Sequence, residues 1–175
     1  FRRTHGSPLT DDRTELREDT VQRVSLEGEL LDERSIVAAI TAEDSGFVLG
    51  EVAPARSGGV SYLDLVHANS VEFLSRPELA VEHPLYAPGN VLISTRHQDR
   101  VLVMNWESGE LVWSWGQGEL LGPHDATVLD GGNLLIFDNG LGRGWSRVLE
   151  LDPRSGEVVW QYKAPEPTDF YTASR

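Results

Sequence analysis

The sequence contains no cysteine, so disulfides, thiol catalysis and thiolate metal sites are excluded within this chain. Basic residues are also scarce: 15 Lys and Arg stand against 28 Asp and Glu, which gives a formal net charge of -13. Such an acidic chain is not expected to bind nucleic acid or an anionic membrane surface. Long apolar runs are missing too. A membrane helix needs about 20 apolar residues, and the longest runs here, 101–104 and 134–137, have the length of strands.

The chain has 175 residues, of which 39% are hydrophobic, and this is enough for one domain with a sizeable core. Residues 1–20 are polar and charged without clear periodicity, which predicts an irregular, poorly anchored lead-in. Residues 21–61 begin with two short strand-like segments around a Glu-Gly-Glu turn. They continue with room for a short helix in 34–47 and with a loop from residue 48 that proline and glycine interrupt.

From residue 62 the sequence predicts two successive runs of four short strands. The first run comprises 67–74, 91–95, 101–104 and 111–115, and the second comprises 124–129, 134–137, 148–151 and 158–162. Residues 100–113 align without gaps with 147–160, and Arg, Val, Leu, Ser, Gly, Glu, Val and Trp recur in register. Four short strands per repeat, at a period of about 45–60 residues, are typical of β-propeller blades.

We therefore expect an all-β fold of the β-propeller type. Residues 62–118 and 119–163 are each predicted to form a full four-stranded blade, 21–61 a partial blade and connector, and 164–175 the start of the next blade. A propeller closes with about 4–8 blades, so we expect an incomplete arc of one propeller domain. It is either a fragment of a longer polypeptide or half of a homo-oligomeric assembly.

Blade topology predicts where the histidines lie, because successive connections alternate between the two ends of an up-and-down sheet. His67 and His124 precede the innermost strands of their blades, so both should border the central channel. The connectors after the second strands share that face and contribute further polar residues: Arg96, His97, Asn139 and Arg143. His83 is predicted to lie on the opposite face, and His5 has no predicted place.

These residues by themselves leave three interpretations open. Histidines at strand starts can bond to the backbone of a neighbouring blade, in a non-catalytic propeller that binds a ligand or a protein. Imidazoles can also hold a metal ion, but only Asp64 and Asp125 are nearby carboxylates and no compact ligand motif is present, so we assign no metal. Finally, Arg96 offers a planar fork to a sulfate- or phosphate-like group, which a neutral imidazole can attack.

Four segments of the sequence resemble the bacterial aryl-sulfate sulfotransferase (arylsulfotransferase, ASST) family. They are His-Ala-Asn-Ser-Val-Glu-Phe at 67–73, Val-Leu-Ile-Ser-Thr-Arg-His-Gln at 91–98, Gly-Pro-His-Asp-Ala-Thr at 122–127 and Asn-Leu-Leu-Ile-Phe-Asp-Asn-Gly at 133–140. The resemblance covers about residues 62–175, with a weaker echo at 21–33. It implies a six-bladed propeller. It also implies an enzyme that moves a sulfuryl group from a phenolic sulfate ester to a phenol, without a nucleotide sulfate donor or another cofactor.

The resemblance also implies roles for individual residues. His124 matches the nucleophile of a ping-pong reaction through a sulfohistidine, and His67 and Arg96 match residues that bind the sulfuryl oxygens. Further substrate contacts are expected from neighbouring polar residues: His97, Asn69, Asn139 and Arg143. Another histidine of the family lies upstream, in a blade that this chain lacks, so the fragment alone is expected to be inactive. The family resemblance implies a periplasmic or secreted location.

Overall fold

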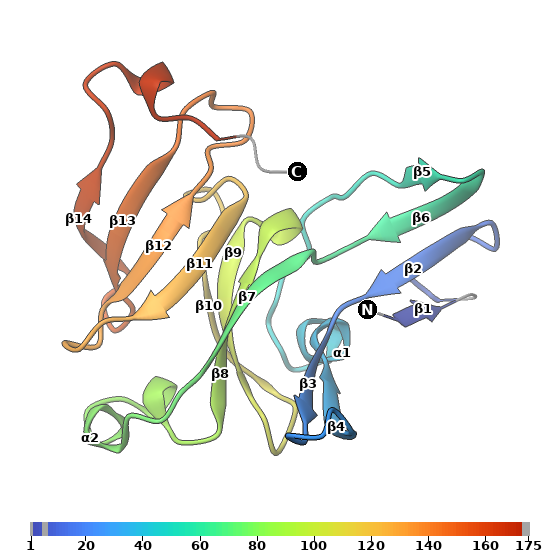
Figure 1. Ribbon diagram of the computed structural model, residues 1–175, viewed down its shortest axis with the longest axis horizontal. Helices are drawn as coiled ribbons and strands as arrows, with labels where there is room; N and C mark the ends of the chain where they lie inside the picture. The colour runs from blue at the N-terminus through green and yellow to red at the C-terminus, as the bar shows by residue number, and fades with distance from the viewer. Residues whose placement is uncertain (1, 5–6, 173–175) are drawn as a thin grey trace.

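The computed structural model describes residues 2–4 and 7–172, with only the backbone described for 2–4. Strands make up 42% of the chain and helices 11%, so the prediction of an all-β fold is confirmed. Three four-stranded sheets and a two-stranded hairpin lie beside one another across the molecule (Figure 1).

The central sheet is antiparallel and its four strands follow the chain order. It consists of β7 (Ala68–Phe73), β8 (Asn90–Thr95), β9 (Arg100–Asn105) and β10 (Leu111–Trp115). Every residue of β8 is buried, as are the first five residues of β9, because other elements cover both faces of the sheet. A strand that is buried on both faces has a continuous apolar sequence rather than an alternating one, which explains the runs 91–93 and 101–104.

The second sheet has the same antiparallel order. It consists of β11 (Pro123–Val128), β12 (Leu134–Asp138), β13 (Arg147–Asp152) and β14 (Glu157–Tyr162). Buried and half-buried residues alternate along β12, whereas β14 is exposed at every position. The eight strands predicted between residues 67 and 162 are therefore confirmed, and no end differs by more than one residue.

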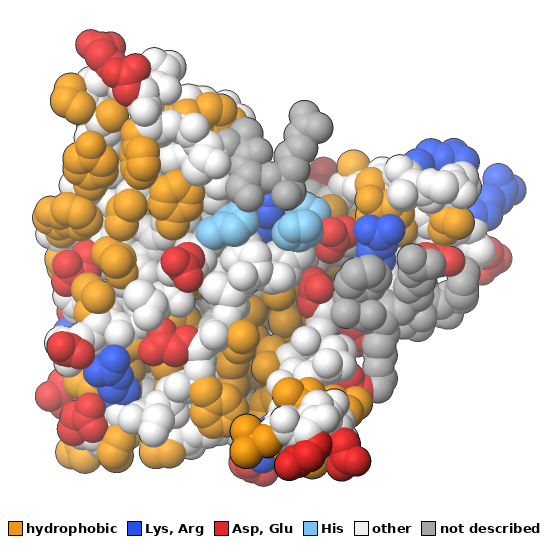
Figure 2. All heavy atoms as spheres, in the orientation of Figure 1, with side chains coloured by type: hydrophobic (Ala, Val, Ile, Leu, Met, Phe, Trp, Pro, Cys, Tyr) orange, Lys and Arg blue, Asp and Glu red, His pale blue; other side chains and the backbone are white. Residues whose placement is uncertain are grey.

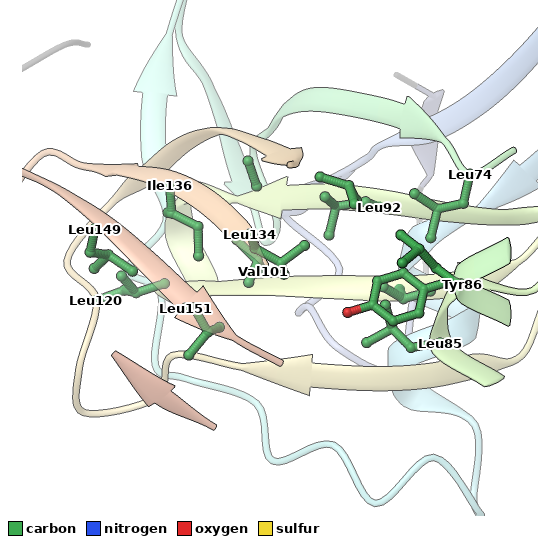
Figure 3. Close-up of a cluster of buried hydrophobic side chains, with 14 residues drawn as sticks. Leu74, Leu85, Tyr86, Leu92, Val101, Leu120, Leu134, Ile136, Leu149 and Leu151 are labelled. Carbon is green, nitrogen blue, oxygen red and sulfur yellow. The ribbon is translucent and has the colours of Figure 1, made fainter. Parts of the chain in front are cut away.

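An apolar core fills the space between these two sheets (Figure 3). The side chains that meet there include Leu92, Val101 and Val103 from the central sheet and Leu134, Ile136, Leu149 and Leu151 from the second. The proline-rich excursion at 75–89 folds into α2 (Pro77–Ala80) and η1 (Pro84–Tyr86) and covers one end of this core. Its Tyr86 is fully buried, and its hydroxyl donates a 2.6 Å hydrogen bond to the carbonyl of Gly132.

The other face of the central sheet packs against a hairpin and a short helix. The hairpin is β3 (Thr20–Val24) with β4 (Leu30–Ser35), and α1 (Ile36–Thr41) follows it directly, as predicted for 21–33 and 34–47. Ser35 caps α1, because its Oγ accepts a 2.9 Å hydrogen bond from the backbone N–H of Ala38. None of the described helices is long and apolar enough to cross a membrane.

A third sheet corrects the predictions for the first part of the chain. It joins β1 (Arg2–Thr4), β2 (Thr14–Glu18), β6 (Val60–Asp64) and β5 (Ala55–Ser57), so the irregular lead-in over 1–20 and the loop over 48–61 were wrong predictions for these segments. The reason is that β2 pairs in parallel with β6, in a register that sets residue 14 opposite residue 61. Pairing over that distance leaves no local sequence signal, and strands of three to five residues show little alternation.

Candidate functional site

The first residues of β7 and β11, the strands that begin at His67 and His124 in the sequence prediction, lie side by side (Figure 1). The side-chain amide of Asn69 donates a 2.9 Å hydrogen bond to the carbonyl of Pro123 and so joins the two strand starts. Further along β11, the N–H of Ala126 donates a 3.1 Å hydrogen bond to Oγ of Ser94 on β8. These two contacts fix the position of His124 relative to the central sheet.

His67 and His124 are not at equivalent ladder positions, although both stand at strand starts. Thr95 and Asp138 are equivalent positions, because they pair with the repeated arginines Arg100 and Arg147. Thr95 also pairs with Ala68, and Asp138 also pairs with Pro123. His67 therefore corresponds to Gly122, and His124 is the second residue of β11. The register breaks between residues 68 and 70 in β7 but between 124 and 127 in β11, so the bulges of the two strands differ.

Three groups hold His67 and His97 together. The ring nitrogen Nδ1 of His67 lies 2.7 Å from the carboxylate of Asp64, and Nδ1 of His97 lies 2.6 Å from the backbone carbonyl of the same residue. A carbonyl can only accept, so Nδ1 of His97 carries the proton and its Nε2 accepts from Arg96 Nη1 at 2.7 Å. The two imidazole rings lie 4.5 Å apart.

Arg96 connects this pair to the His124 turn. It begins η2 (Arg96–Gln98) directly after β8. Its Cγ lies 3.7 Å from the position that a Cβ would take at Gly122, two residues before His124. Figure 2 shows His side chains on both sides of a basic side chain on this face of the molecule. Arg96 and His67 thus both contact His97, whereas His124 adjoins this group through the turn at Gly122. That His67, Arg96, His97 and His124 form one substrate site stays a prediction.

The hydrogen bond of His124 fixes its tautomer. Its Nδ1 lies 3.1 Å from the carbonyl of Gly122, which accepts the ring proton. Nε2 then keeps its lone pair. The residue is half-buried.

Carboxylates near the site have pKa values that shift in different directions. Burial alone raises the pKa of Asp64, but the hydrogen bond from His67 and the charges of His67, His97 and Arg17 together lower it below its ordinary value. Burial raises the pKa of Asp19, whose carboxylate accepts from the N–H of Ala68 at 3.1 Å.

Asp99, which follows η2, has its pKa raised by burial. Its Oδ1 accepts a 2.7 Å hydrogen bond from the N–H of Gly122, and the backbone of Asp99 has a positive φ of 51°. Asp99 thus holds the His124 turn from the central sheet.

Two cavities adjoin this group of residues. One of about 260 Å³ is lined by Arg96, His97, Asp99, Leu121 and Leu141, together with residues 51–53. The other, of about 250 Å³, is lined by Arg17, Asp19, Asp64, His67 and Ala68. Together they offer space for small molecules on either side of the Asp64–His97 contact.

Asn139 and Arg143 belong to the β12–β13 connector, and both have partners within the protein. Asn139 is buried and its amide donates to the carbonyl of Thr172 at 2.9 Å. Arg143 donates to the carboxylate of Asp138 at 3.0 Å and lies 4.0 Å above the ring of Trp145. These contacts hold the connector, and contact with a substrate stays a prediction for both residues.

His83 lies between α2 and η1, at the opposite end of β7 from His67, as predicted (Figure 1). Its Nδ1 accepts a 3.1 Å hydrogen bond from the N–H of Leu85, so it caps η1. His5 lies outside the described residues.

Asp64, His67 and His97 are close enough for a metal ion to be considered, since one ligand atom from each lies within 4.8 Å of the others. The donor chemistry does not fit. Nδ1 of His97 donates to a carbonyl, and the guanidinium of Arg96 lies 2.7 Å from Nε2 of the same ring. A cation at this point would displace one of these bonds and meet a fixed positive charge.

The sequence reasoning gave no role to the acidic residues that support the site, Asp19, Asp64 and Asp99. Asp64 stands three residues before His67, and this spacing at the end of a strand was the one available signal. Asp19 reaches the site through the parallel pairing of β2 with β6, which no local pattern announces.

Comparison with known proteins agrees with the family resemblance seen in the sequence. The model of the family described as arylsulfotransferase (ASST) matches residues 6–175. No curated protein matches the chain at a significant level. Since the family match spans nearly the whole sequence, the chain belongs to the arylsulfotransferase (ASST) family.

Proposed function

We propose that this chain supplies the sulfuryl-transfer centre of an aryl-sulfate sulfotransferase. A phenolic sulfate ester is the donor, a phenol is the acceptor, and His124 carries the sulfuryl group between them. Family membership supports small aryl substrates of this kind.

The observation that carries the proposal is the hydrogen bond between Nδ1 of His124 and the carbonyl of Gly122. It leaves Nε2 with a lone pair for attack on sulfur, and no described residue forms a hydrogen bond with Nε2. An imidazole that is fixed in this tautomer is an activated nucleophile of the kind that covalent catalysis requires.

The reaction then has two balanced steps. Nε2 of His124 forms a bond to sulfur as the bond between sulfur and the donor's phenolic oxygen breaks; that oxygen keeps the bonding electron pair, takes up a proton and leaves as the first phenol. The acceptor phenol then gives up its proton as its oxygen bonds to sulfur, and the S–N electron pair returns to Nε2. In this mechanism Arg96 and His67 bind the sulfuryl oxygens, because positively charged groups and N–H donors stabilise the charge that develops there. Asn69 acts by positioning β11 through the carbonyl of Pro123.

We also infer that the two four-stranded antiparallel sheets are successive propeller blades. Three residues of the central sheet contribute to the core against the second sheet: Leu92, Val101 and Trp113. The equivalent residues of the second sheet are Leu135, Val148 and Trp160. All three are half-buried or exposed, and Trp160 is 50% exposed. A further sheet of the same kind, from the same polypeptide or from a second copy, fits that outer face.

The test is to incubate the polypeptide that contains this chain, with any further blades it has, with p-nitrophenyl sulfate and to measure its intact mass. We expect one added sulfuryl group, mapped to His124. The variant His124→Ala should show neither the adduct nor release of p-nitrophenol. His83→Ala is the matched control, because His83 lies at the far end of β7. An unmodified wild-type protein, or normal turnover by His124→Ala, would refute the proposal.

A further inference from the structure

Asp64 contacts both His67 and His97 in the candidate site. It is the last residue of β6, and its carboxylate lies 2.7 Å from Nδ1 of His67. Its backbone carbonyl lies 2.6 Å from Nδ1 of His97. A single residue therefore fixes the orientation and the tautomer of two imidazoles.

The charges around His67 make Asp64 its ionised partner. Two carboxylates flank this histidine, because Asp19 accepts from the N–H of Ala68, the next residue along the chain. The pKa of Asp64 is lowered, whereas the pKa of Asp19 is raised by burial and by the charge of Asp64. Arg17 from β2 also faces Asp64 and favours its negative form. Carboxylates that are pushed apart in this way take different roles.

We propose that Asp64 is the positioning residue of the sulfuryl-transfer site, an inference that rests on the function proposed above. Its carboxylate holds one proton of His67 on Nδ1 and stabilises positive charge on that ring, and its carbonyl turns Nε2 of His97 toward Arg96. Asp64 itself touches no reacting atom. It acts as the carboxylate does in hydrolase triads, where the acid fixes the tautomer and stabilises the imidazolium.

This arrangement gives His67 a proton to transfer. As the bond between sulfur and the donor oxygen breaks, Nε2–H of the His67 imidazolium gives its proton to the leaving phenolic oxygen, and the ring becomes neutral with its other proton on Nδ1. The acceptor phenol returns a proton to Nε2 when its oxygen attacks the sulfohistidine. The charge is balanced in each step, and His67 ends as it began.

The tautomers can be measured without any activity, by nitrogen NMR of this chain labelled with ¹⁵N-histidine. We expect Nδ1 of His67 to be protonated in the folded protein. His83 is the internal reference, because its Nδ1 accepts a hydrogen bond and its proton must lie on Nε2. A His67 ring with the His83 pattern would overturn the proposal.

The variant Asp64→Asn tests the cause. The amide has nearly the shape of the carboxylate but can donate to Nδ1, so His67 should change to the Nε2–H tautomer. His97 should keep its tautomer, because the backbone carbonyl that it binds is unchanged. If His67 keeps its wild-type tautomer in Asp64→Asn while the amide spectrum is still that of a folded protein, the assignment is contradicted.

Kinetics separate positioning from simple damage. Asp64→Asn should lower kcat for phenyl sulfate about 100-fold with little change in KM, and for p-nitrophenyl sulfate by less than about 10-fold, because nitrophenolate leaves without a proton. Asp130→Asn is the control and should behave like the wild type, because the exposed carboxylate of Asp130 pairs with Arg76 beyond the far end of β11. Equal losses for the two esters would refute the proton-transfer role. If the wild-type protein forms no sulfohistidine, the proposed function fails, and the tautomer measurements still decide what Asp64 does.

Discussion

Replacing Asp138 by alanine should destabilise the protein strongly, because this carboxylate joins four parts of the second sheet. The side chain is fully buried. Its Oδ1 accepts from the N–H of Leu121 at 2.9 Å and of Gly140 at 3.3 Å, and its Oδ2 accepts from Arg143 at 3.0 Å and Arg147 at 2.8 Å. Leu121 directly precedes the Gly122–His124 turn, so the same bonds hold the candidate nucleophile.

The size of the effect follows from burial. Removing one partner of a buried ion pair costs about 3–5 kcal/mol, because the remaining charge is left unpaired. The side chains of Arg143 and Arg147 are 18% and 13% exposed, so water reaches them in part. We therefore expect the lower end of that range, about 3 kcal/mol, and a fall in melting temperature of about 6–12 °C for a chain of this length.

Equilibrium urea unfolding of Asp138→Ala measures this loss. Asp130→Ala is the matched control, since its carboxylate also pairs with an arginine, Arg76 at 3.2 Å, but is fully exposed. A surface pair of this kind contributes at most about 1 kcal/mol. The reasoning is refuted if the two variants lose the same free energy of unfolding at an unchanged m-value.

Two further substitutions test the loops around the site. Gly140 and Gly142 both have positive φ, but a Cβ at Gly140 would lie 1.8 Å from the carbonyl oxygen of Trp145, whereas nothing lies near Gly142. Both alanine variants lose about 1–2 kcal/mol to left-handed strain, so any larger loss of unfolding free energy in Gly140→Ala measures the clash; equal losses would mean that the loop yields. Burial raises the pKa of Asp99 in the folded protein above its value in the unfolded chain. The favourable contribution of Asp99 to folding stability is therefore present below the unfolded pKa and is lost as pH rises through the folded pKa. Asp99→Asn keeps an acceptor for Gly122 and tolerates the positive φ, so it should be more stable than the wild type at pH 7 but not at pH 3 in parallel thermal melts; no gain at pH 7 would count against this pKa direction.

The strands that local pattern could predict are those with neighbours along the chain. Residues 67–162 form two sheets in which each strand pairs with the next, so every turn and alternation lies within a short window. The sheet of β1, β2, β6 and β5 could not be predicted in the same way, because β2 finds its partner about 47 residues away. A short polar segment with a remote partner looks irregular until that partner is known.

Strand topology was enough to predict which face of the sheets the candidate residues occupy, but not which side chains they contact. Alternating connections were enough to bring His67, Arg96 and His97 to one face and to send His83 to the other. They could not reveal that the two bulges differ, which sets His124 two ladder positions beyond His67. Side-chain partners likewise depend on three-dimensional packing, so the supporting role of Asp64 was not predicted.

The parallel pairing of β2 with β6 also has a consequence for how the protein folds. The hairpin of β11 and β12, which carries His124, closes a short loop, whereas the β6 end at Asp64 must wait until β2 arrives from about 47 residues away. Contacts between distant residues form slowly because a larger loss of chain entropy precedes them. The two halves of the candidate site should therefore form at different times during folding. Pulse-labelling hydrogen exchange during refolding should protect the amides of β12 before those of β6.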